Sequence, residues 1–78
     1  MNKDEVENIT IVETLYFLRK ILRPEFSPIP VIEHVYHLNR DGYVSALIEI
    51  MEHRHDKEFL LKTFGARLRP GWEKVIKS

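Results

Sequence analysis

The apolar residues in the first third of the chain recur at helical spacing. Between residues 6 and 22 they return every three or four positions, as on one face of a helix: Ile9, Val12, Leu15, Tyr16, Leu18 and Leu22. Acidic residues precede this stretch and basic residues end it, which is the charge order that the helix dipole favours. Pro24 cannot continue the helix, so the pattern predicts a first helix over residues 6–22.

A second helix is predicted over residues 28–40. Ser27 is a suitable N-cap, and Pro28 would occupy the first helical position, where a missing N–H costs nothing. Asp41 and Gly42 are expected to end the helix. Its apolar face would consist of Ile29, Ile32, Val35, Tyr36 and Leu38.

Residues 43–64 fit two patterns. In a β-hairpin, one strand face would carry Val44, Ala46, Ile48 and Ile50, with a tight turn at His55-Asp56 and a returning strand from Glu58 to Phe64. In a helix, Ala46, Leu47, Ile50 and Met51 would form the apolar stripe. The β-branched and aromatic residues at the start of this region favour the hairpin. Gly65 interrupts either element, and Pro70 opens a short last helix that contains Trp72, Val75 and Ile76.

With the hairpin, the element order becomes helix, helix, strand, turn, strand, helix. Residues 38–44, LNRDGYV, then resemble the exit from the recognition helix of a winged helix-turn-helix domain into its first wing strand. Residues 59–68, FLLKTFGARL, resemble the second wing strand turning into the last helix, with Leu61 and Leu68 sealing the hairpin on the helices. The resemblance implies a small α+β domain with the winged-helix architecture; the alternative fold is an all-α helical bundle. The chain has room for only one helix between Pro24 and the exit, where the family has two.

Length and composition set the class of protein. The 78 residues predict a single domain over 1–78, with residues 1–5 expected to fray. There is no cysteine, so disulfides and thiolate metal sites are excluded, and the apolar core must hold the fold. Twelve Lys and Arg balance 12 Asp and Glu, a neutrality unusual for a dedicated nucleic-acid binder. The chain has no apolar run of membrane-spanning length and no signal-peptide pattern, so we expect no membrane association and a cytoplasmic location.

Catalytic and metal-binding chemistry finds little support in the sequence. Ser27, Ser45 and Ser78 are not in a nucleophile elbow, and the three glycines form no phosphate-cradling loop. Two histidine pairs, His34 with His37 and His53 with His55, have residue types that bind zinc. They lack the His-Glu-x-x-His pattern, so we interpret them as solvated or partner-facing. The sequence therefore predicts no enzyme activity, no cofactor, no metal and no small-molecule substrate.

Two kinds of binding surface remain. On the winged-helix interpretation, the second helix would face DNA with His34, His37, Asn39 and Arg40, and the wing would offer Arg54, His55 and Lys57. Arg67 and Arg69 would contact phosphates, although acidic residues are interspersed among all these positions. Trp72, close in sequence to the two arginines, is a candidate for a protein interface or for the core.

The sequence hypothesis is thus a small regulatory binding protein of winged-helix type that associates with nucleic acid. The alternative is a protein-binding modulator, such as a phage- or plasmid-type small inhibitor of a larger host machine. Homodimerisation is the least specific form of that alternative.

Overall fold

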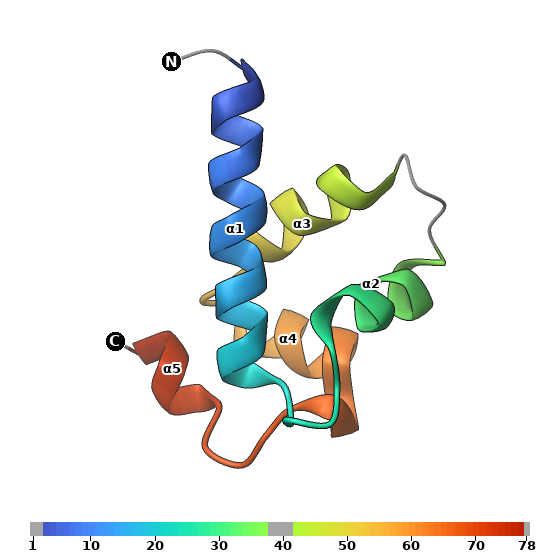
Figure 1. Ribbon diagram of the computed structural model, residues 1–78. Helices are drawn as coiled ribbons and strands as arrows, with labels where there is room; N and C mark the ends of the chain where they lie inside the picture. The colour runs from blue at the N-terminus through green and yellow to red at the C-terminus, as the bar shows by residue number, and fades with distance from the viewer. Residues whose placement is uncertain (1–2, 38–41, 78) are drawn as a thin grey trace.

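The protein is built from helices that pack around one long central helix (Figure 1). The computed structural model describes residues 3–37 and 42–77, with side chains described for 10–37 and 42–76. In chain order the helices are α1 (Lys3–Ile21), α2 (Pro28–Tyr36), α3 (Tyr43–Glu52), α4 (Lys57–Phe64) and α5 (Glu73–Lys77), and the short 3-10 helix η2 (Gly65–Arg67) follows α4 directly. The central helix, α1, packs mainly against α3 and also against α2 and α5.

The predicted winged-helix fold is wrong, because the part of the chain that the structure describes contains no strand. The predicted hairpin region instead forms α3 and α4, as the all-helical alternative required. The buried residues of α3 are Ala46, Leu47 and Ile50. Their spacing of i, i+1 and i+4 is that of one helix face, whereas a strand would have buried every second residue. Packing of this stripe against α1 decided the conformation over the β propensity of the individual residues. Leu61, expected to seal the hairpin, lies on α4 with 53% of its surface exposed.

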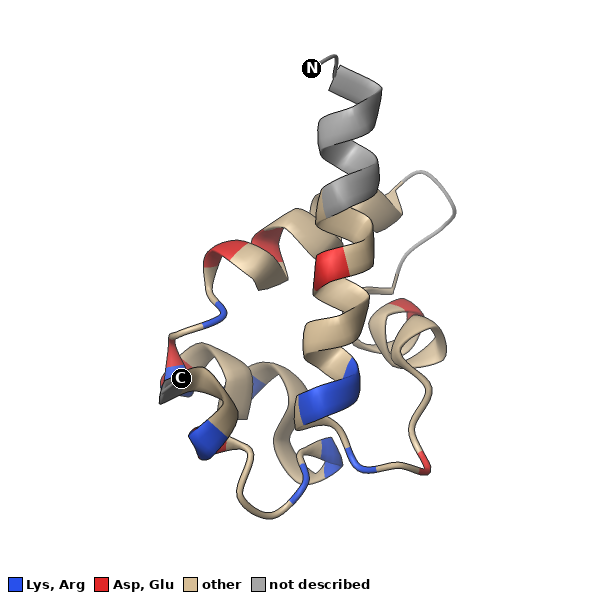
Figure 2. Cartoon of the chain, turned by 60° about the vertical axis from the view of Figure 1, so that its left-hand side comes forward, with Lys and Arg blue, Asp and Glu red and all other residues tan. Residues whose placement is uncertain are grey.

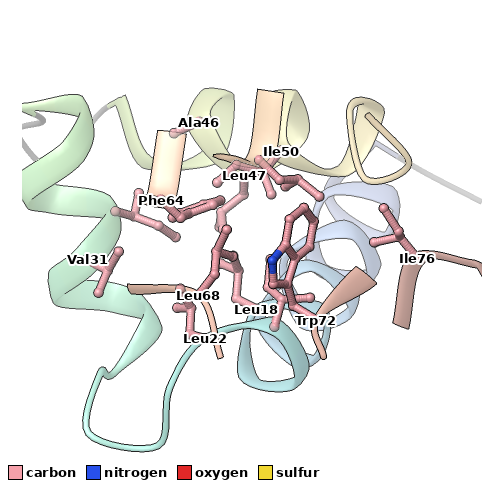
Figure 3. Close-up of a cluster of buried hydrophobic side chains, with 13 residues drawn as sticks. Leu18, Leu22, Val31, Ala46, Leu47, Ile50, Phe64, Leu68, Trp72 and Ile76 are labelled. Carbon is pink, nitrogen blue, oxygen red and sulfur yellow. The ribbon is translucent and has the colours of Figure 1, made fainter. Parts of the chain in front are cut away.

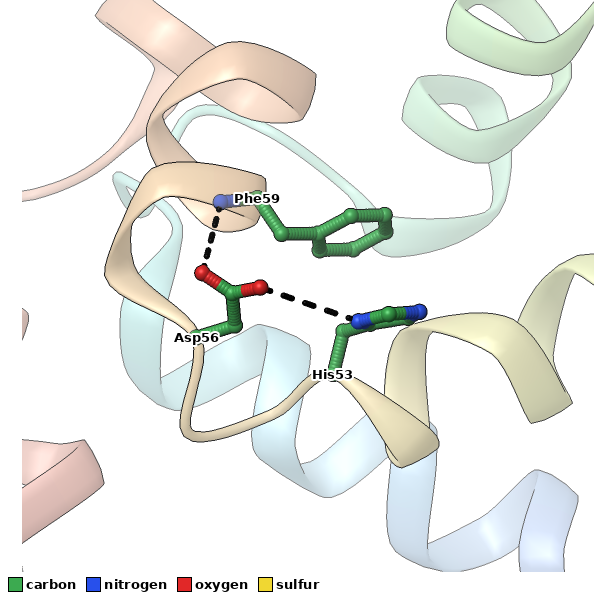
Figure 4. A network of polar contacts seen from close by, with 3 residues as sticks. All are labelled: His53, Asp56 and Phe59. Carbon is green, nitrogen blue, oxygen red and sulfur yellow. Dashed lines mark hydrogen bonds and ion pairs between the residues drawn. The ribbon is translucent and has the colours of Figure 1, made fainter.

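The predicted turn at His55-Asp56 joins two helices and not two strands: the backbone N–H of Asp56 donates to the carbonyl of His53 at 2.9 Å, and α4 begins at the next residue. The carboxylate of Asp56 accepts a hydrogen bond from the backbone N–H of Phe59 at 3.2 Å and thereby caps α4 (Figure 4). The same carboxylate lies 3.8 Å from Nδ1 of His53, and the His53 ring stacks on Phe59 with centroids 4.5 Å apart. Gly65 ends α4 with a φ of 50°, a conformation that glycine adopts without strain.

The helix over residues 28–40 was predicted too long. The observed α2 ends at Tyr36, and His37 follows in the left-handed conformation with a φ of 53°. Gly42, expected to end this helix, has a φ of −83° and is instead the residue that precedes α3. Asp41, the other residue predicted to end this helix, lies outside the described residues.

A single apolar cluster joins all the helices. The cluster includes Leu18 and Ile21 of α1 and Leu22, which directly follows α1. Figure 3 shows Leu18 and Leu22 together with Val31 of α2, Leu47 of α3 and Phe64 of α4. Trp72 lies in the same cluster with 5% of its surface exposed, and Leu68 with 6%. The indole is therefore mainly a core group, which was one of the two roles considered for it.

In the described part of the chain, no helix combines the length and the apolar character needed to cross a membrane.

Candidate functional site

Two segments far apart in the sequence run side by side at one end of the molecule. The backbone N–H of Arg23 donates to the carbonyl of Arg67 at 2.9 Å, and that of Arg69 donates to the carbonyl of Ile21 at 2.8 Å. Between these bonds, Leu22 and Leu68 form an antiparallel bridge, and both side chains are buried. Burial of the two leucines therefore brings the basic end of α1 beside the basic stretch that follows α4.

This juxtaposition gathers four arginines, which we call the arginine end: Arg19, Arg23, Arg67 and Arg69. Figure 2 shows the basic colour at the lower end of α1 and along the neighbouring chain, whereas the acidic positions of α3 lie elsewhere. The chain has zero net charge, so the arginine end is a local concentration of positive charge and not a consequence of a basic composition.

Two open hollows lie within the arginine end, one on each side of Phe26 and Ser27. The first, of about 370 Å³, is bordered by Arg19, Arg23 and Arg69. The second, also about 370 Å³, is bordered by Arg67 and by His34 of α2. Glu25 lines both hollows and is, among the described residues, the one carboxylate at either of them.

The arginine charges are not neutralised within the described residues. The ion pair among the described residues joins His53 and Asp56, which line neither hollow, and none of the four arginines is paired with a carboxylate. Guanidinium groups without a carboxylate partner remain able to attract an external anion. The arrangement is therefore suited to binding phosphate or carboxylate groups.

Two of the four arginines also support the fold. Arg69 donates from Nε to the carbonyl of Leu22 at 2.7 Å and from Nη2 to the carbonyl of Arg19 at 2.7 Å. These carbonyls lie at the end of α1, where helical partners are missing, so Arg69 acts as a C-terminal cap. Arg23 donates from Nε to the carbonyl of Ala66 at 3.2 Å. The guanidinium groups of Arg19 and Arg67 make no such bond among the described residues.

The N-terminus of α2, which borders both hollows, adds little to anion binding. Pro28 and Pro30 occupy its first turn and carry no N–H. The backbone N–H of Val31 already donates to the carbonyl of Ser27 at 3.3 Å. An anion at this end would therefore be held by side chains and not by a helix terminus.

A second surface, which we call the α1 groove, lies on another side of α1. This hollow of about 360 Å³ has an apolar lining of Tyr16, Phe17, Met51, Val75 and Ile76 and a charged or polar rim of Glu13, Lys20, Arg54 and His55. The Nδ1–H of His55 donates to the carbonyl of Ile76 at 3.0 Å, which ties the turn after α3 to α5. Tyr16 is 60% exposed beside the groove, and Val12 is 52% exposed one turn earlier.

Family models, curated proteins and solved structures give no match to this chain.

The predicted site residues do not form one surface. Arg67, Arg69 and His34 lie at the arginine end, whereas Arg54 and His55 border the α1 groove. The remaining predicted residues lie elsewhere: Lys57 begins α4, His37 follows α2, Trp72 is in the core, and Asn39 and Arg40 are outside the described residues. The expected row of wing contacts at Arg54, His55 and Lys57 does not exist, because no wing forms.

The two histidine pairs do not meet. The rings of His34 and His37 are 6.5 Å apart at the end of α2, and His53 and His55 flank the turn before α4. Within the described residues, no three or more His, Asp or Glu side chains gather closely enough to hold a metal ion.

Arg19 and Arg23 were absent from the predicted site. The signal for them was present, since the sequence shows basic residues at the end of the first helix. Their significance depends on Arg67 and Arg69 arriving beside them, which a pattern along the chain does not reveal.

Proposed function

We propose that this protein is a small non-catalytic regulator that associates with nucleic acid through the arginine end. The observation that supports the proposal is the convergence of four arginines with no carboxylate partner among the described residues. The planar guanidinium group matches a phosphate with two parallel hydrogen bonds, and arginine is preferred where nucleic-acid backbones are recognised.

The chemistry of this surface favours contact with the phosphate backbone over reading of bases. Within the described residues, the four arginines come from the end of α1, from η2 and from the loops that follow each of them, and not from one face of a single helix as on a recognition helix. Phosphate contacts position a protein on nucleic acid and carry no sequence information. We therefore expect binding that is insensitive to sequence.

The expected affinity is modest and strongly dependent on salt. If three arginines each meet one phosphate, the slope of log affinity against log salt concentration is about −2.7. The exposed carboxylates of Glu49 and Glu52 on α3 would repel a nucleic acid that extended over the whole molecule. Contact is thus confined to one end of the protein.

Fluorescence anisotropy of a labelled generic duplex, titrated with the protein at low and moderate salt, tests the proposal. We expect binding at low salt that weakens steeply as salt rises. The variant Arg19→Gln/Arg67→Gln should bind at least tenfold more weakly, because each lost arginine contact removes a counterion-releasing interaction. Both residues are chosen because their guanidinium groups support no described contact.

The matched control is Lys57→Gln/Lys62→Gln on α4, which changes the net charge by the same amount at two residues that line neither hollow of the arginine end. Equal losses in the two variants would mean that net charge, and not the arginine end, controls binding. No binding of the duplex at low salt would refute the proposal.

A modulator of a partner protein is the second candidate, favoured by the α1 groove. Tyr16, Phe17 and Met51 line this hollow, and aromatic and methionine side chains are enriched in protein–protein interfaces. Contacts with phosphate groups do not require them. Such a protein would show little affinity for any duplex, so the same titration separates the two candidates.

A further inference from the structure

The exposed face of α1 carries an apolar stripe that continues into the α1 groove. Val12 and Tyr16 are four residues apart, so they lie one above the other on the helix. They are 52% and 60% exposed, and Tyr16 borders the hollow formed with Met51 and Val75. Isolated apolar residues are common on surfaces, but a stripe adjoining an apolar hollow is typical of an interaction site.

Two opposite charges lie along one side of this stripe. Glu13 and Lys20 are seven residues apart, which is close to two helical turns, so both project on one side of Tyr16. Their separation along the axis is about 10 Å, with Tyr16 and Phe17 at the midpoint. Both side chains are exposed, and neither makes an ion pair with a described residue. Figure 2 shows this order along α1, with an acidic position in its middle and basic positions at its lower end.

This charge pattern is complementary to itself under a two-fold rotation. If a second α1 lies antiparallel, with the axis passing between Tyr16 and Phe17, Glu13 of each copy faces Lys20 of the other. In a parallel arrangement, Glu13 would instead face Glu13 of the other copy, and Lys20 would face the other Lys20, so like charges would repel. The two flanking charges are therefore complementary to a second copy of α1 and favour its antiparallel direction over the parallel one.

We propose that the α1 groove is the interface of a homodimer in which the α1 helices pack antiparallel. Each Tyr16 is then positioned near the symmetry axis, where its ring enters the apolar hollow of the other copy. Tyrosine is well suited to this role, because it buries a large rigid surface at little cost in conformational entropy. An interface of one helix and one hollow per copy is small, so we expect a dissociation constant on the order of 10 μM.

Sedimentation velocity over a concentration series tests the proposal on the complete chain. The protein should pass from monomer to dimer as concentration rises. Tyr16→Ser should raise the dissociation constant about a hundredfold, as expected for an aromatic residue at the centre of an interface. Leu61→Ser on α4 is the matched control, since Leu61 is 53% exposed and does not line the α1 groove, and it should leave the equilibrium unchanged.

Exchange of the two charges tests the antiparallel arrangement. Glu13→Lys places a lysine opposite Lys20 twice in the dimer and should raise the dissociation constant roughly tenfold. The combined variant Glu13→Lys/Lys20→Glu restores both opposite-charge pairs and should recover dimerisation. Circular dichroism of each variant verifies that the helical fold is retained.

A protein that stays monomeric at all concentrations overturns the proposal, as does a dimer that survives Tyr16→Ser. A dimer that the single and combined charge variants weaken equally overturns the antiparallel packing. The arginine end lies on a different part of the surface, so failure of the dimer and failure of nucleic-acid binding are separate results.

Discussion

Arg69 offers a sharp test of the distinction between holding the fold and binding a ligand. Its guanidinium donates to the carbonyls of Leu22 and Arg19, both at 2.7 Å, at the end of α1. Arg69→Met keeps most of the aliphatic stem and removes both donors. The backbone N–H of residue 69, which donates to Ile21, is unaffected.

The expected loss of stability follows from these two bonds. A hydrogen bond to a charged group contributes about 1.5–3 kcal/mol when it is well shielded. Here the bond to Arg19 is exposed and the bond to Leu22 is partly buried, so water can rehydrate the carbonyls in the variant. We therefore expect a decrease of about 2 kcal/mol in the free energy of unfolding, out of about 4–12 kcal/mol for a domain of this size. The melting temperature should fall by about 8–16 °C.

Urea and thermal denaturation measure the effect. The chain has a single tryptophan, the buried Trp72, so its fluorescence reports unfolding alongside the helical circular dichroism signal. Arg67→Met is the control, because its guanidinium supports no described contact, and it should change stability by less than about 0.5 kcal/mol. If Arg69→Met unfolds with the same midpoint as Arg67→Met, the capping role assigned to Arg69 is refuted.

Substitutions at three further positions probe the remaining local interactions. Asp56→Ala removes the cap of α4 and should cost about 1 kcal/mol in a urea titration, whereas Asp56→Asn, which still accepts a hydrogen bond, should cost less. The buried hydroxyl of Tyr36 has no hydrogen-bond partner among the described residues, so Tyr36→Phe should leave stability at neutral pH equal or slightly higher. Burial, and secondarily the charge of Glu49, raises the pKa of Tyr36 from 10.0 to about 12. As the pH rises, the unfolded chain therefore loses the Tyr36 proton before the folded protein does, so the free energy of unfolding should fall between pH 10 and 12. The fall should be smaller in Tyr36→Phe, which lacks this proton. Urea denaturation of both proteins at several alkaline pH values measures the difference. Trp72→Ala should cost about 3–5 kcal/mol, and a variant that keeps its unfolding midpoint would contradict the core role of the indole.

The sequence predicted those elements that depend on residues close together along the chain. The first two helices were predicted because their apolar periodicity is bounded by residues with strong backbone preferences, Pro24 and Pro28. Gly65 was recognised as a break for the same reason. The region that forms α3 failed because Ala46 and Ile50 belong to both the alternating and the helical pattern.

The candidate site divides in the same way. Arg67 and Arg69, predicted from residue type, belong to the arginine end, and His34 lines one of its hollows, whereas binding by these residues stays a prediction. Arg54, His55 and Lys57 were grouped through a hairpin that does not form, so their assignment to one surface failed with the fold.

The sequence by itself determined the positions of the first helix, the break at Gly65 and the presence of two basic stretches, because each depends on neighbouring residues. Only the tertiary structure decided that residues 43–52 are helical, since the deciding factor is burial of Leu47 and its neighbours against α1. It also decided that Arg19 and Arg23 lie beside Arg67 and Arg69. Electrostatic attraction depends on distance in space, and that distance was set by the pairing of Leu22 with Leu68 in the core.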